Sequence, residues 1–322
     1  MKFIKNFDVI KRAKTILIIT AAVLLLGALS MVILGFNVDI DFTGGTEIQY
    51  DIGRDLTQKD YDDINGIIED LFGKRYVSST TKDLNIPSLA IIRTGTAELT
   101  AEQQDKFLKK LDEFYGVDHT ESTLFSINYI SATVGDEMTE TAIVSVIVAI
   151  VAMLIYIAFR FKSVDSALAA ISGLAFSTFV MVAAYSIFNI PVDVNIIAAL
   201  LTILGYSINA TIIIFDRIRE NNMKDRDVKT FAQIVSDGTR QTLGRTLNTT
   251  LTTLLTILMI YIFGVDSIRD FALPLIIGIL AGLFSSVCLS GYLWVKYDTW
   301  FKPLKDKLVI RKGARKAAKK KA

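Results

Sequence analysis

The sequence predicts a polytopic α-helical membrane protein that carries one α+β domain between its first two membrane-spanning helices. Hydrophobic residues make up 52% of the 322-residue chain and the mean hydropathy is +0.44, which is unusual for a soluble domain. Six apolar segments are each about 20 residues or longer, enough to cross a hydrocarbon core of about 30 Å. The region between the first two segments instead shows the periodicities of strands and helices.

The chain begins with a short basic segment, residues 1–14, and the first span follows at 15–36. This apolar run is longer than the roughly 7–15 residues of a cleaved signal, and no convincing small-residue cleavage site follows it, so we interpret it as an uncleaved anchor. The later segments are the domain 37–138, spans at 139–160, 164–188 and 194–215, a connection at 217–244, spans at 245–263 and 271–295, and a tail at 296–322.

The distribution of basic residues predicts the orientation. Residues 37–138 contain nine basic and twenty acidic residues, whereas the termini and the connections on the other side hold 25 of the 35 lysines and arginines. Short loops rich in Lys and Arg stay in the cytoplasm, so both termini are expected there and residues 37–138 outside. The tail could bind anionic lipid or ribosomal RNA, but we favour a positive-inside tail without a specific partner, and no nucleic acid is expected to bind.

Residues 37–138 alternate between strand and helix patterns. In 46–52 the side chains of Ile48, Tyr50 and Ile52 share one face, as in a strand, and further strands are predicted at 75–80, 89–94 and 123–133. Two helices separate them, which gives the order β-α-β-β-α-β of a ferredoxin-like domain. That fold hosts many unrelated functions and does not by itself indicate one.

Capping residues mark the starts of these two helices. Thr57 precedes the first helix, and Thr100 precedes the second with Gln103 in capping-box spacing. The predicted apolar face of the second helix consists of Phe107, Leu108, Leu111 and Phe114.

The domain shows no arrangement of residues that indicates catalysis. It contains no paired carboxylates, no nucleophile with a base and no cluster of metal ligands, and its acidic residues are interpreted as a solvated face. The only histidine, His119, lies in a predicted loop, and the only cysteine, Cys288, lies within the sixth span. One cysteine excludes an intrachain disulfide or a cysteine metal cluster. We therefore predict no enzymatic activity, no cofactor and no metal site.

A glycine-rich motif connects the first span to the domain. It reads DIDFTGGT from residue 39 to 46 and contains Asp41, Gly44 and Gly45. Adjacent glycines permit backbone angles that other residues avoid, and they allow close backbone approach. The motif is either a tight turn that enters the first strand or a functional contact surface.

The fourth predicted span carries polar side chains at a seven-residue spacing. They are Asn195, Thr202, Asn209 and Asp216. At about 100° per residue these positions share one face of a helix, with Tyr206 beside them. Polar groups in hydrocarbon are costly, so the row should face other helices or a hydrated pathway. It either lines an ion pathway or supplies hydrogen bonds between helices. For Asp216, which lies next to two arginines, we favour a salt bridge.

The last two spans and the connection before them have their own patterns. Arg245 opens the fifth span, and threonines that include Thr249 and Thr253 give that span a hydroxyl-lined face suited to packing or hydration. Gly278 and Gly282 in the sixth span have the small-xxx-small spacing of a close helix-packing seam. In the connection, an amphipathic helix on the membrane surface is predicted, with one apolar face made of Phe231, Ile234 and Val235.

Three motifs and the span layout together resemble one family. The motifs are VDIDFTGGTEI at 38–48, VDVNIIAALLTILGYSINATIIIFDRIREN at 192–221 and RQTLGRTLNTTLTTLL at 240–255. With six spans and one large loop after the first, the chain resembles the SecF subunits of the SecD/SecF family, within the resistance-nodulation-division superfamily. The short loop favours SecF over SecD or a fused form.

The resemblance implies a role in protein secretion. A SecD partner would supply a second six-helix half, and the pair would act with the SecYEG channel on translocating secretory polypeptides in the bacterial cytoplasmic membrane. Family members are thought to use the proton or sodium gradient. The resemblance also implies that Arg245 neutralises membrane carboxylates, and a positive-inside anchor at the helix start is the less favoured alternative.

At one position the chain departs from the family pattern. The motif GYS-x-N is usually followed by an aspartate, the presumed ion carrier, and this chain has Ala210 there. An alanine side chain cannot bind a proton or coordinate sodium. Three functions are therefore considered, namely an ion-coupled SecF-like translocation subunit, a scaffold subunit of the translocon without ion coupling, and a half-size small-molecule exporter. The single hundred-residue domain argues against the exporter.

Overall fold

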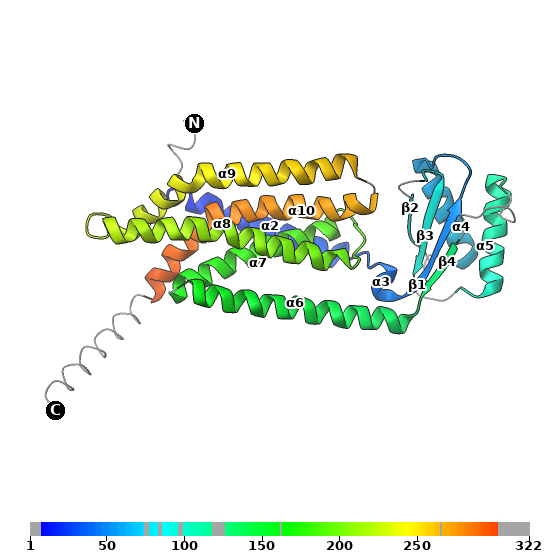
Figure 1. The fold of residues 1–322 in the computed structure, drawn as a ribbon, viewed down its shortest axis with the longest axis horizontal. Coiled ribbons are helices and arrows are strands. Elements are labelled where there is room, and N and C mark those ends of the chain that lie inside the picture. The colour runs from blue at the N-terminus through cyan, green and yellow to red at the C-terminus, as the bar shows by residue number, and fades with distance from the viewer. Residues whose placement is uncertain are drawn as a thin grey trace, which may run out of the picture.

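The protein consists of a bundle of long helices with a small α/β domain at one end (Figure 1). This computed structural model describes residues 8–73, 77–82, 86–95, 99–117, 126–161, 163–264 and 266–301. Within these residues, six helices are long and apolar enough to cross a membrane. The mostly helical architecture with six candidate spans agrees with the sequence prediction.

Each candidate span is a continuous helix except the last, which contains one π-helical segment. The spans are α2 (Ala13–Ile33), α6 (Ala132–Arg160), α7 (Val164–Ile187), α8 (Asn195–Asp225), α9 (Phe231–Phe263) and α10 (Asp266–Phe284). The π-helical segment η3 (Ser285–Leu289) follows α10, and the last helix then continues, so that the sixth candidate span covers Ile268–Phe301. The α7 helix contacts α2, α6, α8 and α10. It therefore lies near the centre of the bundle.

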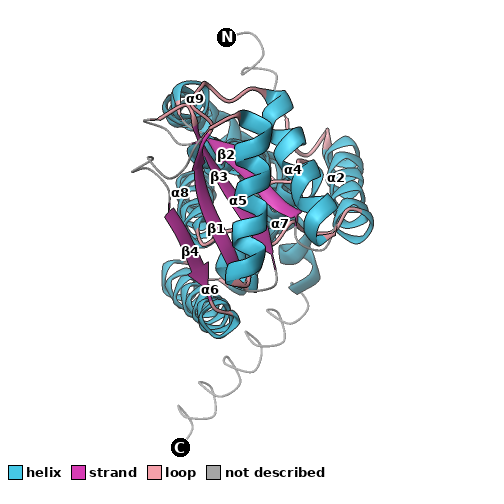
Figure 2. Ribbon diagram, turned by 90° about the vertical axis from the view of Figure 1, so that its right-hand side faces the viewer, coloured by secondary structure: helices cyan, strands magenta, loops and turns pink. Residues whose placement is uncertain are grey.

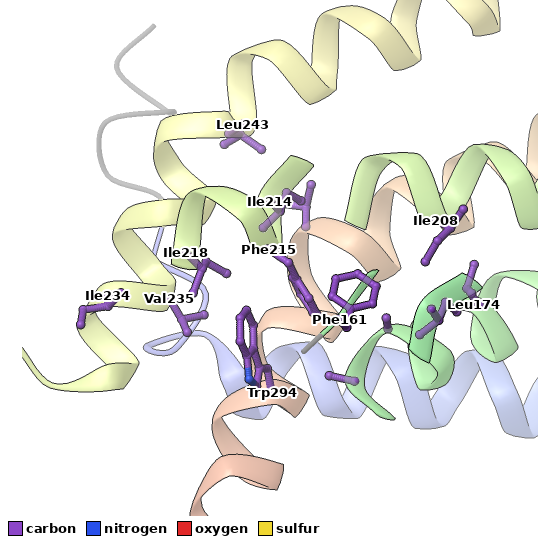
Figure 3. Close-up of a cluster of buried hydrophobic side chains, with 14 residues drawn as sticks. Phe161, Leu174, Ile208, Ile214, Phe215, Ile218, Ile234, Val235, Leu243 and Trp294 are labelled. Atoms are coloured by element: carbon purple, nitrogen blue, oxygen red, sulfur yellow. The ribbon is translucent and has the colours of Figure 1, made fainter. Parts of the chain in front are cut away.

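Helices α8 and α9 extend well beyond their predicted spans, and this corrects the prediction of a separate connection at 217–244. The first part of that connection belongs to α8, and the part from Phe231 onward belongs to α9. Ile234 and Val235 are buried in a cluster with Ile218 and Trp294 rather than lying on a membrane surface (Figure 3). Hydropathy falls where charged residues begin, but both helices continue because they bury apolar side chains against each other there.

The α/β domain has the predicted order of elements. Helix α3 (Ile40–Thr43) precedes β1 (Gly45–Asp51), α4 (Gln58–Phe72), β2 (Val77–Lys82), β3 (Leu89–Gly95), α5 (Ala101–Tyr115) and β4 (Ser126–Ile130). The strands pair antiparallel in the order β2-β3-β1-β4. Helices α4 and α5 cover the face of the sheet that points away from the bundle (Figures 1 and 2).

The core of this domain lies between the sheet and the two helices. Ile48 and Tyr50 of β1 are fully buried against Phe107 and Leu111 of α5. The structure shows both capping boxes, at Thr57 and Thr100. Phe114, predicted in the apolar face of α5, is instead 55% exposed in the last turn. The described part of β4 is shorter than predicted because α6 starts at Ala132, and the predictions for His119 and the tail beyond residue 301 lie outside the described residues.

Glycines allow the domain to approach the start of α6 closely. Gly44 has a φ of +71°, and a Cβ there would lie 2.9 Å from the backbone nitrogen of Ala132. From the other side, a Cβ on Gly135 would lie 2.8 Å from the backbone nitrogen of Gly44. The glycine-rich motif thus acts as a tight turn with close backbone contact.

The linker from α2 to the domain is tied to the start of α8. The backbone N–H of Val192 donates to the carbonyl of Asn37 (2.8 Å), and the N–H of Asp39 donates to the carbonyl of Val192 (3.1 Å). The Asp39 side chain is buried and pairs with Arg93 of β3 at 3.0 Å, and Arg93 also contacts Glu47 of β1 at 3.1 Å. Backbone pairing and a charged network therefore connect the sheet with the loop that enters α8.

A candidate ion pathway and partner interface on α8 and α9

The polar row of α8 is largely open in this chain. The side chains of Asn195, Thr202 and Asn209 are all exposed. The Thr202 hydroxyl donates to the carbonyl of Ala198 (2.7 Å), and the Asn195 amide donates to Asp193. No helix of the described chain covers these three residues, so the face that they share is available to a partner.

The other two members of the predicted row lie differently. Tyr206 is half-buried and packs against the cluster around Met181 and Ile203. Asp216 forms an ion pair with Arg160 of α6, and Arg219 lies 3.8 Å from it. The salt bridge expected for Asp216 is present, and its closest partner is an arginine from a different helix.

Arg245 lies on α9 beside the charged part of α8. A pocket of about 450 Å³ is lined by Asp216, Arg217, Glu220, Gln241 and Arg245, together with Ile213 and Thr242. Arg217 donates to Gln241 (2.6 Å) and pairs with Glu220 (2.7 Å). The Arg245 guanidinium is exposed and forms no ion pair with the described residues. Its charge is therefore not neutralised within the described chain.

Two predicted threonines of α9, Thr249 and Thr253, follow Arg245 by about one and two helical turns. The hydroxyl of Thr249 donates to the carbonyl of Arg245 (3.1 Å), and that of Thr253 donates to the carbonyl of Thr249 (3.0 Å). Both hydroxyls keep lone pairs that can accept a hydrogen bond. By contrast, Thr246 and Thr250 are buried, and their hydroxyls have no hydrogen-bond partner in the described part of the chain.

Ala210 lies on the inner side of α8, where it is 8% exposed. Its neighbours in the helix, Ser207 and Thr211, are buried against the last helix. The Thr211 hydroxyl lies 2.9 Å from the hydroxyl of Ser286 in η3, and Ser286 also donates to the carbonyl of Ser207 (3.2 Å). Position 210 therefore has an apolar side chain next to paired hydroxyls.

The glycines of α10 face α8. A Cβ on Gly278 would lie 2.7 Å from Cδ1 of Ile203, and a Cβ on Gly282 would lie 3.3 Å from Cβ of Ser207. Small residues allow this close approach between helices. The π-helical turn that follows places Ser286 against α8. The sequence did not predict this turn, and no pattern in residues 285–289 indicates it.

Sequence reasoning also missed the ion-pair network at Arg93. Its signal was the pair of aspartates in the DIDF motif, because a buried carboxylate requires a cation or hydrogen-bond donors. Asp41 from the same motif accepts a hydrogen bond from the backbone N–H of Val194 at the start of α8 (3.3 Å). Within the described residues no group of three or more His, Cys, Asp or Glu side chains could hold a metal ion.

The fold and this site define a multi-pass membrane protein whose fourth span presents an open polar face beside an unneutralised arginine. Comparisons with known proteins agree with that class. A family model described as "Protein export membrane protein SecD/SecF, C-terminal" matches residues 109–300. The protein translocase subunit SecF of Acidaminococcus fermentans is 32% identical over 292 residues, which cover 90% of this chain and 97% of that protein. The chain therefore belongs to the SecD/SecF family.

This chain matches only part of the length of two SecDF proteins. The protein translocase subunit SecDF of Bacillus subtilis is 34% identical over 91% of this chain, which spans 38% of that protein. A crystal structure of SecDF from Thermus thermophilus, described as translocon-associated, has a TM-score of 0.73 and 32% identity. It matches 91% of this chain and 39% of its own chain.

Proposed function

We propose that this chain is the SecF-type half of a SecD–SecF assembly and that a SecD-type half covers its open polar face. The observations that carry the proposal are the exposed row of Asn195, Thr202 and Asn209 on α8 and the exposed Arg245 on α9, which forms no ion pair with the described residues. In a bilayer Thr202 and Asn209, within the fourth span, would face hydrocarbon, which is costly for polar groups, and Arg245 at the start of the fifth span would lack a counter-ion. A second helical half with a carboxylate near Arg245 removes both costs.

The alignments with fused relatives support this arrangement. This chain matches nearly the whole length of a separate SecF subunit but less than half of the length of the SecDF proteins. More than half of each fused SecDF chain therefore lies outside the part that this chain matches. By the same relationship we propose that the assembly assists secretory polypeptides at the SecYEG channel in the bacterial cytoplasmic membrane.

We place the α/β domain outside the cytoplasm. Its strand order β2-β3-β1-β4 and its β-α-β-β-α-β chain order support a ferredoxin-like fold. It lies at the opposite end of the bundle from the α8–α9 turn, where Arg217, Arg219, Lys224, Arg226 and Lys229 gather. A cytoplasmic position for these basic residues places the domain on the other side of the membrane.

The acid that exchanges ions belongs, in this proposal, to the partner half. Ala210 is buried and apolar, so the fourth span of this chain has no carboxylate at the family's position. Arg245 then serves as the fixed counter-ion of a partner acid, a role suited to a guanidinium because it stays charged. The same alanine favours a second candidate function, a scaffold subunit that works without ion coupling.

The test replaces Arg245 by glutamine and measures the rate at which a secreted protein is processed in cells. Arg240→Gln is the matched control, because Arg240 is an exposed arginine of α9 that already pairs with Asp237 at 2.7 Å. We expect Arg245→Gln to slow secretion at normal protein abundance and Arg240→Gln to leave it unchanged. Normal secretion by Arg245→Gln would instead favour the scaffold function.

A second measurement tests the interface itself. A cysteine at Asn209 should form a cross-link with the fourth span of a SecD-type half, whereas a cysteine at Phe159, on the outer side of α6 and 84% exposed, should not. Recovery of a stable, active chain without any SecD-type half would contradict the proposal.

A further inference from the structure

A second charged cavity lies on a different face of α8 from the Arg245 pocket. Its volume is about 880 Å³, and it is formed where the ends of α6, α8 and the last helix meet the starts of α7 and α9. These helix ends lie opposite the α/β domain (Figure 1). The volume is within the range of roughly 300–1,000 Å³ typical of small-molecule sites.

The lining of this cavity contains more cationic than anionic side chains. Its cations are Arg160, Arg219, Arg226 and Lys229, and its carboxylates are Asp165 and Asp298. Arg160 already pairs with Asp216, and Lys229 pairs with Asp225 and Asp237, so Arg219 and Arg226 are the cations left to bind an anion. Asp165 accepts the hydrogen bond of the Trp294 indole (2.9 Å).

Two of these arginines have guanidinium N–H groups that can still donate hydrogen bonds. Arg226 is exposed and forms no ion pair or side-chain hydrogen bond with the described residues. Arg219 donates from Nη1 to the carbonyl of Arg160 (3.3 Å), but its Nη2 is buried and has no hydrogen-bond partner in the described part of the chain. A buried guanidinium nitrogen without a partner is costly, so an acceptor from outside the protein is expected at this place.

The surroundings favour an anion that also has an apolar part. Helices α7 and α9 both begin at the cavity, and the positive ends of helix dipoles favour anions, although Thr230 and Gln233 cap α9 and Asp165 lies in the first turn of α7. The remaining wall is aromatic and aliphatic, with Phe231 and Trp294 in edge contact at 5.4 Å and Ile234 beside them. Figure 3 shows Trp294 next to Phe215 and Phe161 at the base of this wall.

We propose that this cavity binds a phosphate group, supplied by an anionic phospholipid whose headgroup lies between Arg219 and Arg226. A phosphate oxygen is the acceptor that a guanidinium fork fits best. The apolar wall of Phe231, Ile234 and Trp294 would accommodate the glycerol and the first part of an acyl chain. The position at the basic ends of membrane-spanning helices matches the depth of a lipid headgroup.

The experiment uses the full chain, purified in a neutral detergent and depleted of lipid. Native mass spectrometry measures the binding of added phosphatidylglycerol, with phosphatidylcholine as the zwitterionic comparison. We expect one tightly held phosphatidylglycerol per chain and at least about tenfold weaker binding of phosphatidylcholine. Arg226→Gln should weaken phosphatidylglycerol binding by about tenfold, the equivalent of one charge-assisted hydrogen bond. Arg240→Gln removes the same charge at the same end but outside the cavity, and should not change binding.

Competition with inorganic phosphate distinguishes the two sources of the ligand. Displacement of the lipid by millimolar phosphate would support the site and identify free phosphate as a second ligand, whereas no displacement would support the site with lipid alone. Arg219→Gln is a second variant, but Arg219 also lies over the ring of Phe161 at 5.3 Å, so the exposed Arg226 gives the cleaner result. Equal affinity for the two lipids, or equal loss in Arg226→Gln and Arg240→Gln, would overturn the proposal.

Discussion

Replacing Arg93 by leucine should destabilise the α/β domain and its attachment to the membrane helices. The Arg93 side chain is 28% exposed and contacts Asp39, which is 2% exposed, and Glu47, which is 19% exposed. Removing one partner of a buried ion pair costs about 3–5 kcal/mol, because the remaining charge is left uncompensated. Partial solvent access to Arg93 and Glu47 lowers our expectation to roughly 2–3 kcal/mol.

The dependence on pH separates this charge effect from a simple loss of packing. Burial raises the pKa of Asp39 above its usual value, and the nearby Asp41 and Asp193 add to the shift, while Arg93 opposes it. Without Arg93 the pKa rises further. An acid with a raised pKa in the folded chain binds protons more tightly there, so folding is favoured as the pH falls through that pKa. The deficit of Arg93→Leu should therefore be largest at neutral pH and smaller in acid.

The assay is the thermal midpoint of the α/β domain in the detergent-solubilised chain, followed by limited proteolysis at several pH values. For a domain of roughly 100 residues, 2–3 kcal/mol corresponds to about 10 °C or more. Asp39→Asn serves as the partner variant, since an amide at that position needs no counter-ion. Combining Asp39→Asn with Arg93→Leu should recover part of the loss. An equal loss from Arg93→Leu in both backgrounds, with no dependence on pH, would refute the reasoning.

Three further predictions concern backbone contact, orientation and the ion position. Gly135→Ala should destabilise the chain, because the added Cβ would lie 2.8 Å from a backbone nitrogen of the linker. Gly66→Ala is the control, because a Cβ there would have no atom within 4 Å, and it should stabilise helix α4 by about 0.5–1 kcal/mol. The thermal midpoints of the two variants test this difference. On a cysteine-free background, an impermeant thiol reagent added to intact spheroplasts should modify Lys109→Cys but not Lys224→Cys, and the reverse pattern would invert the orientation. Ala210→Asp places a carboxylate at a position only 8% exposed, so the variant should lower the thermal midpoint of the isolated chain and be better tolerated with a SecD-type half present.

Local patterns in the sequence predicted the α/β domain well. The alternation of Ile48 and Tyr50 identifies the inner face of β1, and both side chains are fully buried. Thr57 and Thr100 cap the starts of their helices as predicted, and Thr100 does so through the capping box with Gln103 that its spacing indicates. Phe114 has the correct helical spacing but is exposed, whereas Tyr115 next to it in the last turn of α5 packs against the core, and its ring centroid lies 6.3 Å from that of Tyr50. Periodicity shows which residues share a face, but not which of them the core reaches.

The membrane part was harder to predict where helices continue beyond their apolar stretch. Hydropathy suggested a break near Arg217, yet α8 and α9 remain helical and pack together in their charged ends. A Cβ on Gly238 of α9 would lie 3.1 Å from the Cα of Ile218, so the lack of a side chain allows this contact. Likewise, the seven-residue spacing identified the row on α8, but only the arrangement of helices shows that Asn209 is open while Asp216 is paired within the chain.

The pairing of the linker with Val192 has a mechanical consequence. Two backbone hydrogen bonds join residues 37–39 to Val192, and Asp41 receives the N–H of Val194, one residue before α8 begins. The helix that presents the open polar face is thus coupled at its first turn to the base of the sheet. A small rotation of α8 about its own axis would therefore be transmitted through this joint to the base of the α/β domain.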